Sequence, residues 1–104
     1  MKTFWNGVIP ALTTPFKADG SVDHAFLAKH AGMMMEAGCT GIVPLGSLGE
    51  TATLTFAEKK AVLETVVKAV GKRGAVVSGL AAISTDEGVA FARMAADVGC
   101  AGLM

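Results

Sequence analysis

The sequence contains few charged residues for its length. Of its 104 residues, 17% are charged and 52% are hydrophobic, whereas ordinary soluble domains carry about 25% charged residues. A chain of this length forms at most one domain. Because a small domain normally needs more polar surface than a large one, this composition indicates part of a larger body whose faces are covered by something else.

No charge of one sign is in excess, since nine Lys and Arg balance nine Asp and Glu. Without a basic stripe the sequence predicts no nucleic-acid partner. No apolar run approaches the roughly 18–20 residues of a membrane span, so no membrane partner is predicted either. The first residues do not read as a signal peptide, which favours a cytoplasmic protein. They are interrupted by polar and turn residues, namely Asn6, Gly7, Pro10 and Thr13.

Cysteine and histidine are scarce. Cys39 and Cys100 stand in similar contexts, AGCTG and VGCAG. Cysteines in a chain of cytosolic character are more often small buried apolar residues than a disulfide or a metal pair. His24 and His30 do not have the i, i+4 spacing of a helical zinc pair. The sequence therefore predicts no metal site.

An alternation of apolar, β-branched runs with helical patterns runs along the whole chain. Strands are predicted over 7–12, 41–45, 75–79 and 101–104, and helices over 22–38, 56–71 and 86–99. Strands that are buried on both faces read as continuous apolar runs, as these do. The pattern predicts an α/β fold with a parallel sheet. It leaves two architectures open: a doubly wound sheet of flavodoxin or Rossmann type, and part of a (β/α)8 barrel.

The predicted helices begin with capping signals. Thr55 with Glu58 and Ser84 with Glu87 fit the capping box, in which a hydroxyl and a carboxylate satisfy each other's backbone N–H groups. Asp23 is placed to cap the first helix.

The segment VPLGSLGETATLT (43–55) joins the second predicted strand to the second predicted helix. Both candidate architectures place chemistry in such loops. Gly46 and Gly49 allow a tight turn and close approach to a ligand, Ser47 adds a hydroxyl, and consecutive N–H groups there can face an anion. The alternative interpretation is an ordinary βα turn. The G-x-S-x-G, Walker A and G-x-G-x-x-G motifs are all absent.

Two segments taken together, GVIPALTTPF (7–16) and GSLGETATLT (46–55), resemble the dihydrodipicolinate synthase / N-acetylneuraminate lyase family of class I pyruvate aldolases. The likeness extends over the whole chain. It implies a (β/α)8 barrel, of which residues 1–104 would be the N-terminal part, with about the first three and a half βα units. It also implies a lyase or synthase that forms a lysine Schiff base with pyruvate or another 2-oxo acid. No cofactor is implied, and the complete chain would be a homotetramer built from tight dimers.

The resemblance assigns roles to individual residues. Ser47 matches a hydroxyl that the family uses in a proton relay and in contact with the bound carboxylate. Gly46, the backbone N–H of Leu48, Ala11 and Thr14 complete the expected substrate-binding set. Leu48 stands where the family has threonine, so one side-chain donor is lost. This difference favours a substrate of another shape over dihydrodipicolinate synthesis itself, and it leaves deamination or dehydration open beside aldol chemistry.

The Schiff-base lysine of the family belongs to the sixth strand and its catalytic tyrosine to the fifth, so neither is expected in this chain. The lysines present fall at the terminus, in a loop or on predicted helix surfaces, without the dry pocket that lowers a lysine pKa. Two alternatives therefore remain beside the enzyme. One is a truncated, inactive barrel fragment that serves as a structural or interaction module. The other is a flavodoxin-like domain whose GSLGE loop holds a phosphate.

Overall fold

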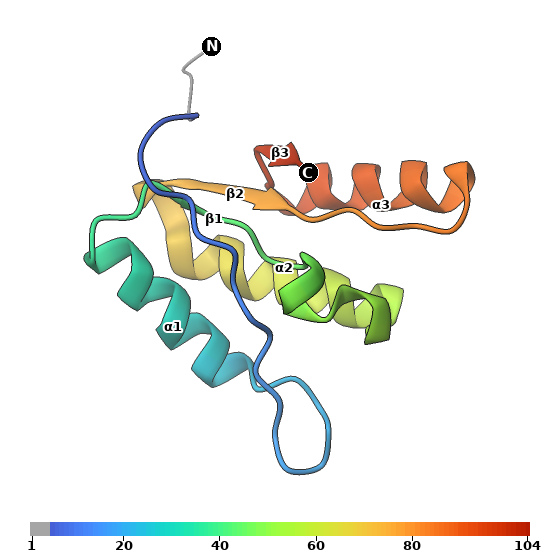
Figure 1. The fold of residues 1–104 in the computed structure, drawn as a ribbon, viewed down its shortest axis with the longest axis horizontal. Coiled ribbons are helices and arrows are strands. Elements are labelled where there is room, and N and C mark those ends of the chain that lie inside the picture. The colour runs from blue at the N-terminus through green and yellow to red at the C-terminus, as the bar shows by residue number, and fades with distance from the viewer. Residues whose placement is uncertain (1–4) are drawn as a thin grey trace.

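The computed structural model describes residues 5–104 (Figure 1). Its helices are α1 (His24–Glu36), α2 (Phe56–Val70) and α3 (Thr85–Val98), and its strands are β1 (Gly41–Ile42), β2 (Ala75–Ser78) and β3 (Gly102–Leu103). Short 3-10 turns are η1 (Ser47–Gly49), η2 (Thr51–Thr53) and η3 (Gly71–Arg73). This order confirms the predicted alternation of strands and helices.

The strands form a parallel sheet whose order, β1-β2-β3, follows the chain. The extended segment before α1 adds to the free edge of β1, where Ala11 pairs in parallel with Val43. Helix α2 packs against both α1 and α3, so the helices follow one another along the sheet (Figure 1). A doubly wound sheet reverses its strand order at a switch point. The sequential order seen here favours the barrel over the doubly wound alternative.

The first predicted strand, 7–12, is reduced to a single bridge. Val43 N donates to Pro10 O and Leu12 N donates to Val43 O, both at 2.8 Å. Pro10 faces β1 but has no N–H to donate, so the ladder is interrupted there. Beyond Pro10, Thr40 N donates to Val8 O at 2.9 Å.

The second strand also ends earlier than predicted, at Ile42 instead of residue 45. Pro44 cannot donate to a ladder. Leu45 then leaves the extended conformation altogether, with a φ of 62°. The turn into the following loop therefore begins inside the predicted strand.

The capping predictions are confirmed at the start of α2. Thr55 Oγ1 accepts from Glu58 N at 3.1 Å, and Glu58 Oε1 accepts from Thr55 N at 2.9 Å. Ser84 caps α3 by accepting from Glu87 N at 3.2 Å, which is one of the two bonds of the capping box predicted there. Asp23 caps α1 through Phe26 N. These local bonds fix where each helix begins.

The core lies between the helices and the sheet, with α2 at its centre. Val62, Leu63 and Val66 are fully buried on the face predicted from the sequence, whereas Val67 is only half-buried. Ile42 and Val76 meet them from the strands. Each such side chain contributes about 1.5–3 kcal/mol on burial.

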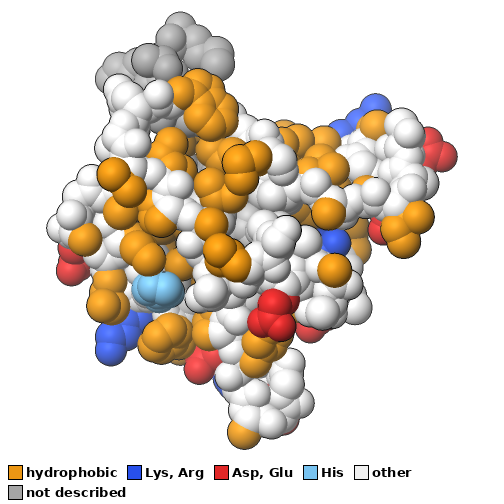
Figure 2. Space-filling view, viewed as in Figure 1, with side chains coloured by type: hydrophobic (Ala, Val, Ile, Leu, Met, Phe, Trp, Pro, Cys, Tyr) orange, Lys and Arg blue, Asp and Glu red, His pale blue; other side chains and the backbone are white. Residues whose placement is uncertain are grey.

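Apolar side chains also remain at the surface. Val8 is 64% exposed and Met33 is 55% exposed. Figure 2 shows apolar side chains gathered over the N-terminal segment and α1. Within residues 5–104, no helix is both long enough and apolar enough to span a membrane.

Candidate functional site

The loop between β1 and α2, residues 43–55, contains two non-glycine residues in the left-handed backbone region. Leu45 has a φ of 62° although its side chain is completely buried, and Glu50 has a φ of 57°. Such a conformation costs a bulky residue on the order of 1–3 kcal/mol, so it persists only where the surroundings impose it. The loop is therefore held in place by its neighbours.

One neighbour is the end of β2. Gly79 N donates to Pro44 O at 2.9 Å. A β-carbon at Gly79 would lie 2.2 Å from Leu45 O and 2.9 Å from Gly46 N. Only glycine allows the two chain segments to come this close.

The other neighbour is the extended segment before α1. The buried hydroxyl of Thr14 donates to Gly49 O at 2.7 Å. Thr14 was predicted to bind substrate; in this structure its hydroxyl proton is engaged by the loop backbone. Ala11 is exposed and pairs through its backbone with Val43. Neither Thr14 nor Ala11 is among the residues that line the pocket beside this loop.

Thr14→Val is expected to lower the free energy of unfolding of the complete polypeptide by about 1–3 kcal/mol, because Gly49 O would lose its buried donor. Urea unfolding followed by circular dichroism measures the change. Thr13→Val is the matched control, since Thr13 is the exposed neighbour and should change stability by less than about 0.5 kcal/mol. Equal losses in both variants would contradict a specific role for the Thr14 hydroxyl.

A pocket of about 180 Å³ opens where β1, β2 and β3 end. Its walls are Leu45, Gly46, Ser47, Thr51, Gly79, Leu80, Ala81 and Met104. The lining contains two hydroxyl side chains and no charged one. It combines an apolar surface with a few polar groups, which is the usual character of a small-molecule site.

The structure brings two of the predicted site residues, Gly46 and Ser47, into this pocket. Leu48 follows them, but its side chain is 52% exposed and lies outside the lining. Within residues 5–104, the N–H groups of Ser47 and Leu48 and the Ser47 hydroxyl take part in no hydrogen bond. These groups are available to a ligand as neutral donors, which suits a carboxylate or a carbonyl oxygen.

Thr51 also lines the pocket and was not singled out from the sequence. The available signal was its position as the next hydroxyl in the same loop. That signal is weak, because threonine is common in turns and nothing local shows which way its side chain turns.

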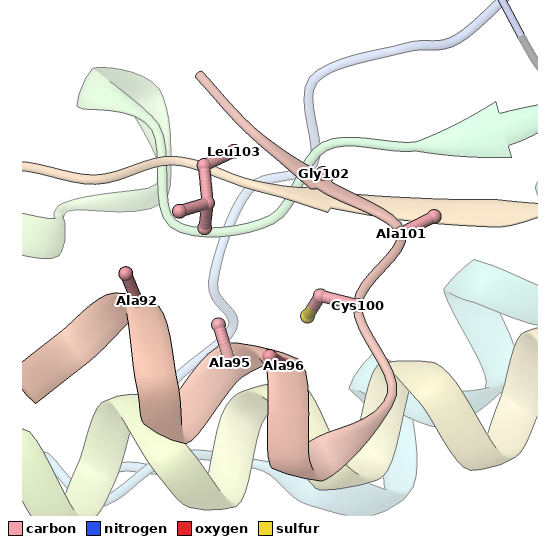
Figure 3. Close-up of a pocket in the computed structure, with 7 residues that line it drawn as sticks. All are labelled: Ala92, Ala95, Ala96, Cys100, Ala101, Gly102 and Leu103. Carbon is pink, nitrogen blue, oxygen red and sulfur yellow. The ribbon is translucent and has the colours of Figure 1, made fainter.

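A second hollow, of about 300 Å³, lies between α3 and β3 and contains Cys100 (Figure 3). Its other lining residues are Ala92, Ala95, Ala96, Ala101, Gly102 and Leu103. The sulfur of Cys100 points into the space between the strand and the helix. Burial raises the pKa of the Cys100 thiol to about 11, so it stays protonated at neutral pH and is a poor nucleophile. Cys39 and Cys100 are both free thiols, and both are half-buried, whereas the sequence predicted buried side chains.

His24 has a structural partner. Its Nδ1 lies 2.7 Å from Thr65 Oγ1, and that hydroxyl donates to Ala61 O at 3.0 Å. The Thr65 hydroxyl can donate to either acceptor, so the tautomer of His24 decides which of the two groups donates in this pair. His30 lies beside the ring of Phe26, at 5.9 Å between ring centres. In the described part of the chain, no group of three His, Cys, Asp or Glu residues could hold a metal ion.

Comparison with known proteins identifies the relatives of this chain. The model of the dihydrodipicolinate synthetase family matches residues 4–104. The 4-hydroxy-tetrahydrodipicolinate synthase of Methanococcus maripaludis strain C5 is 41% identical over 98 residues, which cover 94% of this chain and 34% of that protein.

Solved structures agree with the sequence match. The crystal structure of dihydrodipicolinate synthase from Aquifex aeolicus superposes with a TM-score of 0.90 at 36% identity, over 95% of this chain and 33% of that one. A prophage protein of the dihydrodipicolinic acid synthase family from E. coli K12, in complex with pyruvate, gives a TM-score of 0.90 at 30% identity. That match covers 97% of this chain and 34% of the other.

The chain thus spans about a third of the length of the relatives it matches. The superpositions confirm the predicted architecture, an α/β fold that forms part of a (β/α)8 barrel, and they exclude the flavodoxin-like alternative. The family model matches residues 4–104, a range that includes both segments on which the resemblance was based, 7–16 and 46–55. The chain therefore belongs to the dihydrodipicolinate synthetase family.

Proposed function

We propose that residues 1–104 are the N-terminal part of a (β/α)8-barrel lyase or synthase that binds pyruvate or another 2-oxo acid as a lysine Schiff base. The observation that carries the proposal is the pocket at the carboxyl ends of the strands, with Gly46 and Ser47 in its wall. Active sites of this fold lie at that end of the barrel. A relative of the same family was crystallised in complex with pyruvate.

In the proposed reaction, the amine of a lysine from a later strand attacks the ketone carbon of the 2-oxo acid. Water leaves, and the resulting protonated imine withdraws electrons from the neighbouring carbon. Ser47 passes the protons that these steps release and consume. The N–H of Leu48 donates to the carboxylate of the bound acid. No charged side chain lines the pocket, so the donors that it offers to the carboxylate are neutral.

Leu48 bears on the choice of substrate. A threonine at this position would add a hydroxyl donor, and losing a hydrogen bond to a charged group costs about 1.5–3 kcal/mol if nothing replaces it. The exposed leucine instead presents an apolar surface beside the pocket mouth. We infer a substrate of different shape from that of dihydrodipicolinate synthase, processed by aldol chemistry, deamination or dehydration.

The complete protein is proposed to be a cytoplasmic homotetramer. The apolar surface over the N-terminal segment and α1 supports association with further polypeptide (Figure 2). A second function, that of an inactive barrel fragment acting as a structural or interaction module, is favoured by one observation: none of the pocket-lining residues is a lysine. Intact-mass measurement of the natural polypeptide separates the two, since a species near the 10.5 kDa of this sequence favours the module.

Borohydride reduction in the presence of pyruvate tests the Schiff base directly. The complete polypeptide is expected to gain the mass of one reduced pyruvate imine, located by peptide mapping on a lysine outside residues 1–104. The matched control is reduction without pyruvate, which should leave the mass unchanged. If no adduct forms at saturating pyruvate, the proposed Schiff-base chemistry is wrong.

A further inference from the structure

The buried polar side chains of the described residues are Thr14, Thr51 and Ser78. Two of them are satisfied by the backbone. Thr14 donates to Gly49 O at 2.7 Å, and Ser78 donates to Gly79 O at 2.9 Å. The hydroxyl of Thr51 forms no hydrogen bond within residues 5–104, although the residue is only 7% exposed. Thr51 Oγ1 is not one of the fully buried side-chain atoms that lack a hydrogen-bond partner within residues 5–104, so it is open to a partner in the space beside it.

The position of Thr51 shows where that partner would be. Thr51 lines the same pocket as Ser47, and the other side chains of that lining are apolar: Leu45, Leu80, Ala81 and Met104. None of them offers an oxygen or nitrogen acceptor. The Thr51 carbonyl is already used, since it accepts from Leu54 N at 3.2 Å. The Thr51 hydroxyl is therefore available as a donor to a ligand in the pocket.

We propose that Thr51 is a substrate-binding residue whose hydroxyl donates to the carboxylate of the bound 2-oxo acid, next to the contact made by Ser47. This inference rests on the proposed function of the pocket. Ser47 and Thr51 are the two hydroxyl side chains of the lining, and the side chain of Leu48 lies outside it. Thr51 thus provides the side-chain donor that is missing at Leu48, and it does so from a buried position.

Thr51→Val tests the inference in the complete polypeptide, because valine keeps the shape of threonine and removes the hydroxyl. The readout is the pyruvate concentration that gives half-maximal borohydride-trapped adduct. It is expected to rise about 10-fold to 100-fold, as for loss of a hydrogen bond to a charged group. The adduct at saturating pyruvate should remain, since Thr51 is not the Schiff-base residue. Thr51→Ser keeps the hydroxyl and should stay within about threefold of the parent.

Thr53→Val is the matched control. Thr53 lies on the same η2 turn, is exposed, and donates its hydroxyl to Glu50 O at 2.8 Å. It is outside the pocket lining, so its replacement should leave the half-maximal concentration unchanged. If the valine variant fails to fold, Thr51→Ala is compared with Thr51→Ser, and the same difference is expected.

The outcomes are distinguishable. A parent protein without any adduct overturns the proposed function itself. A parent that forms the adduct, together with a Thr51→Val variant that shows the same half-maximal concentration, overturns only the role of Thr51. Equal shifts in Thr51→Val and Thr53→Val also overturn it, since they would reflect a general disturbance of the turn.

Discussion

Replacing Gly79 with alanine is expected to destabilise the complete polypeptide by about 3 kcal/mol or more and to abolish pyruvate trapping. The added β-carbon would lie 2.2 Å from Leu45 O and 2.6 Å from Leu45 C. These are backbone atoms, so no side-chain rotation can relieve the contact. Either β2 or the loop must move, and the loop carries Ser47.

Thermal unfolding and borohydride trapping measure the two effects together. Gly88→Ala is the matched control, because Gly88 lies within α3 and its nearest neighbours would be 3.8 Å from a β-carbon, an ordinary contact. That change should raise stability by about 0.5–1 kcal/mol, since alanine is the better helix former. A Gly79→Ala protein as stable as the parent would show that the contact between β2 and the loop is not tight.

A polypeptide made of these 104 residues alone is expected to self-associate. The segment around Ala11 and strand β3 would form the two edges of its sheet, with backbone N–H and C=O groups open to pairing. Large apolar side chains lie close to both edges, with Val8 64% exposed and Met104 72% exposed. Contiguous apolar surface of this kind finds a partner or aggregates.

Light scattering at micromolar concentration measures this association. Val8→Lys should reduce it, because a lysine on an edge segment opposes strand pairing. Ala18→Lys, in an exposed loop before α1, adds the same charge away from the edge and should have a smaller effect. A stable monomer with cooperative unfolding would contradict the view that the described sheet has open edges.

The features of the fold that depend on residues close together in the sequence could be predicted from the sequence. The capping box at Thr55 and Glu58 is complete within four residues, and the buried face of α2 follows from a 3.6-residue period. The interruption of the first strand at Pro10 was equally local but was not anticipated, because the run around it is strongly apolar. The strand order required the structure, since both candidate architectures share one pattern.

In the candidate site, too, features set by local sequence could be predicted, whereas features set by tertiary contacts could not. Gly46 and Ser47 were found because chemistry in α/β folds follows strand ends. The contact from Thr14 to Gly49 joins residues 35 positions apart, and no local pattern predicts such a pair. The positive φ of Leu45 runs against the preference of leucine, so tertiary contacts alone impose it.

The contact between Gly79 and Leu45 also constrains how this sequence can drift over evolutionary time. The clash that excludes a side chain at position 79 is with the carbonyl group of Leu45, not with its leucine side chain. A substitution at position 45 alters the side chain and leaves that carbonyl in place. The constraint is therefore one-sided: position 45 can change its side chain as long as the new residue tolerates a positive φ, whereas no such change frees position 79 from glycine.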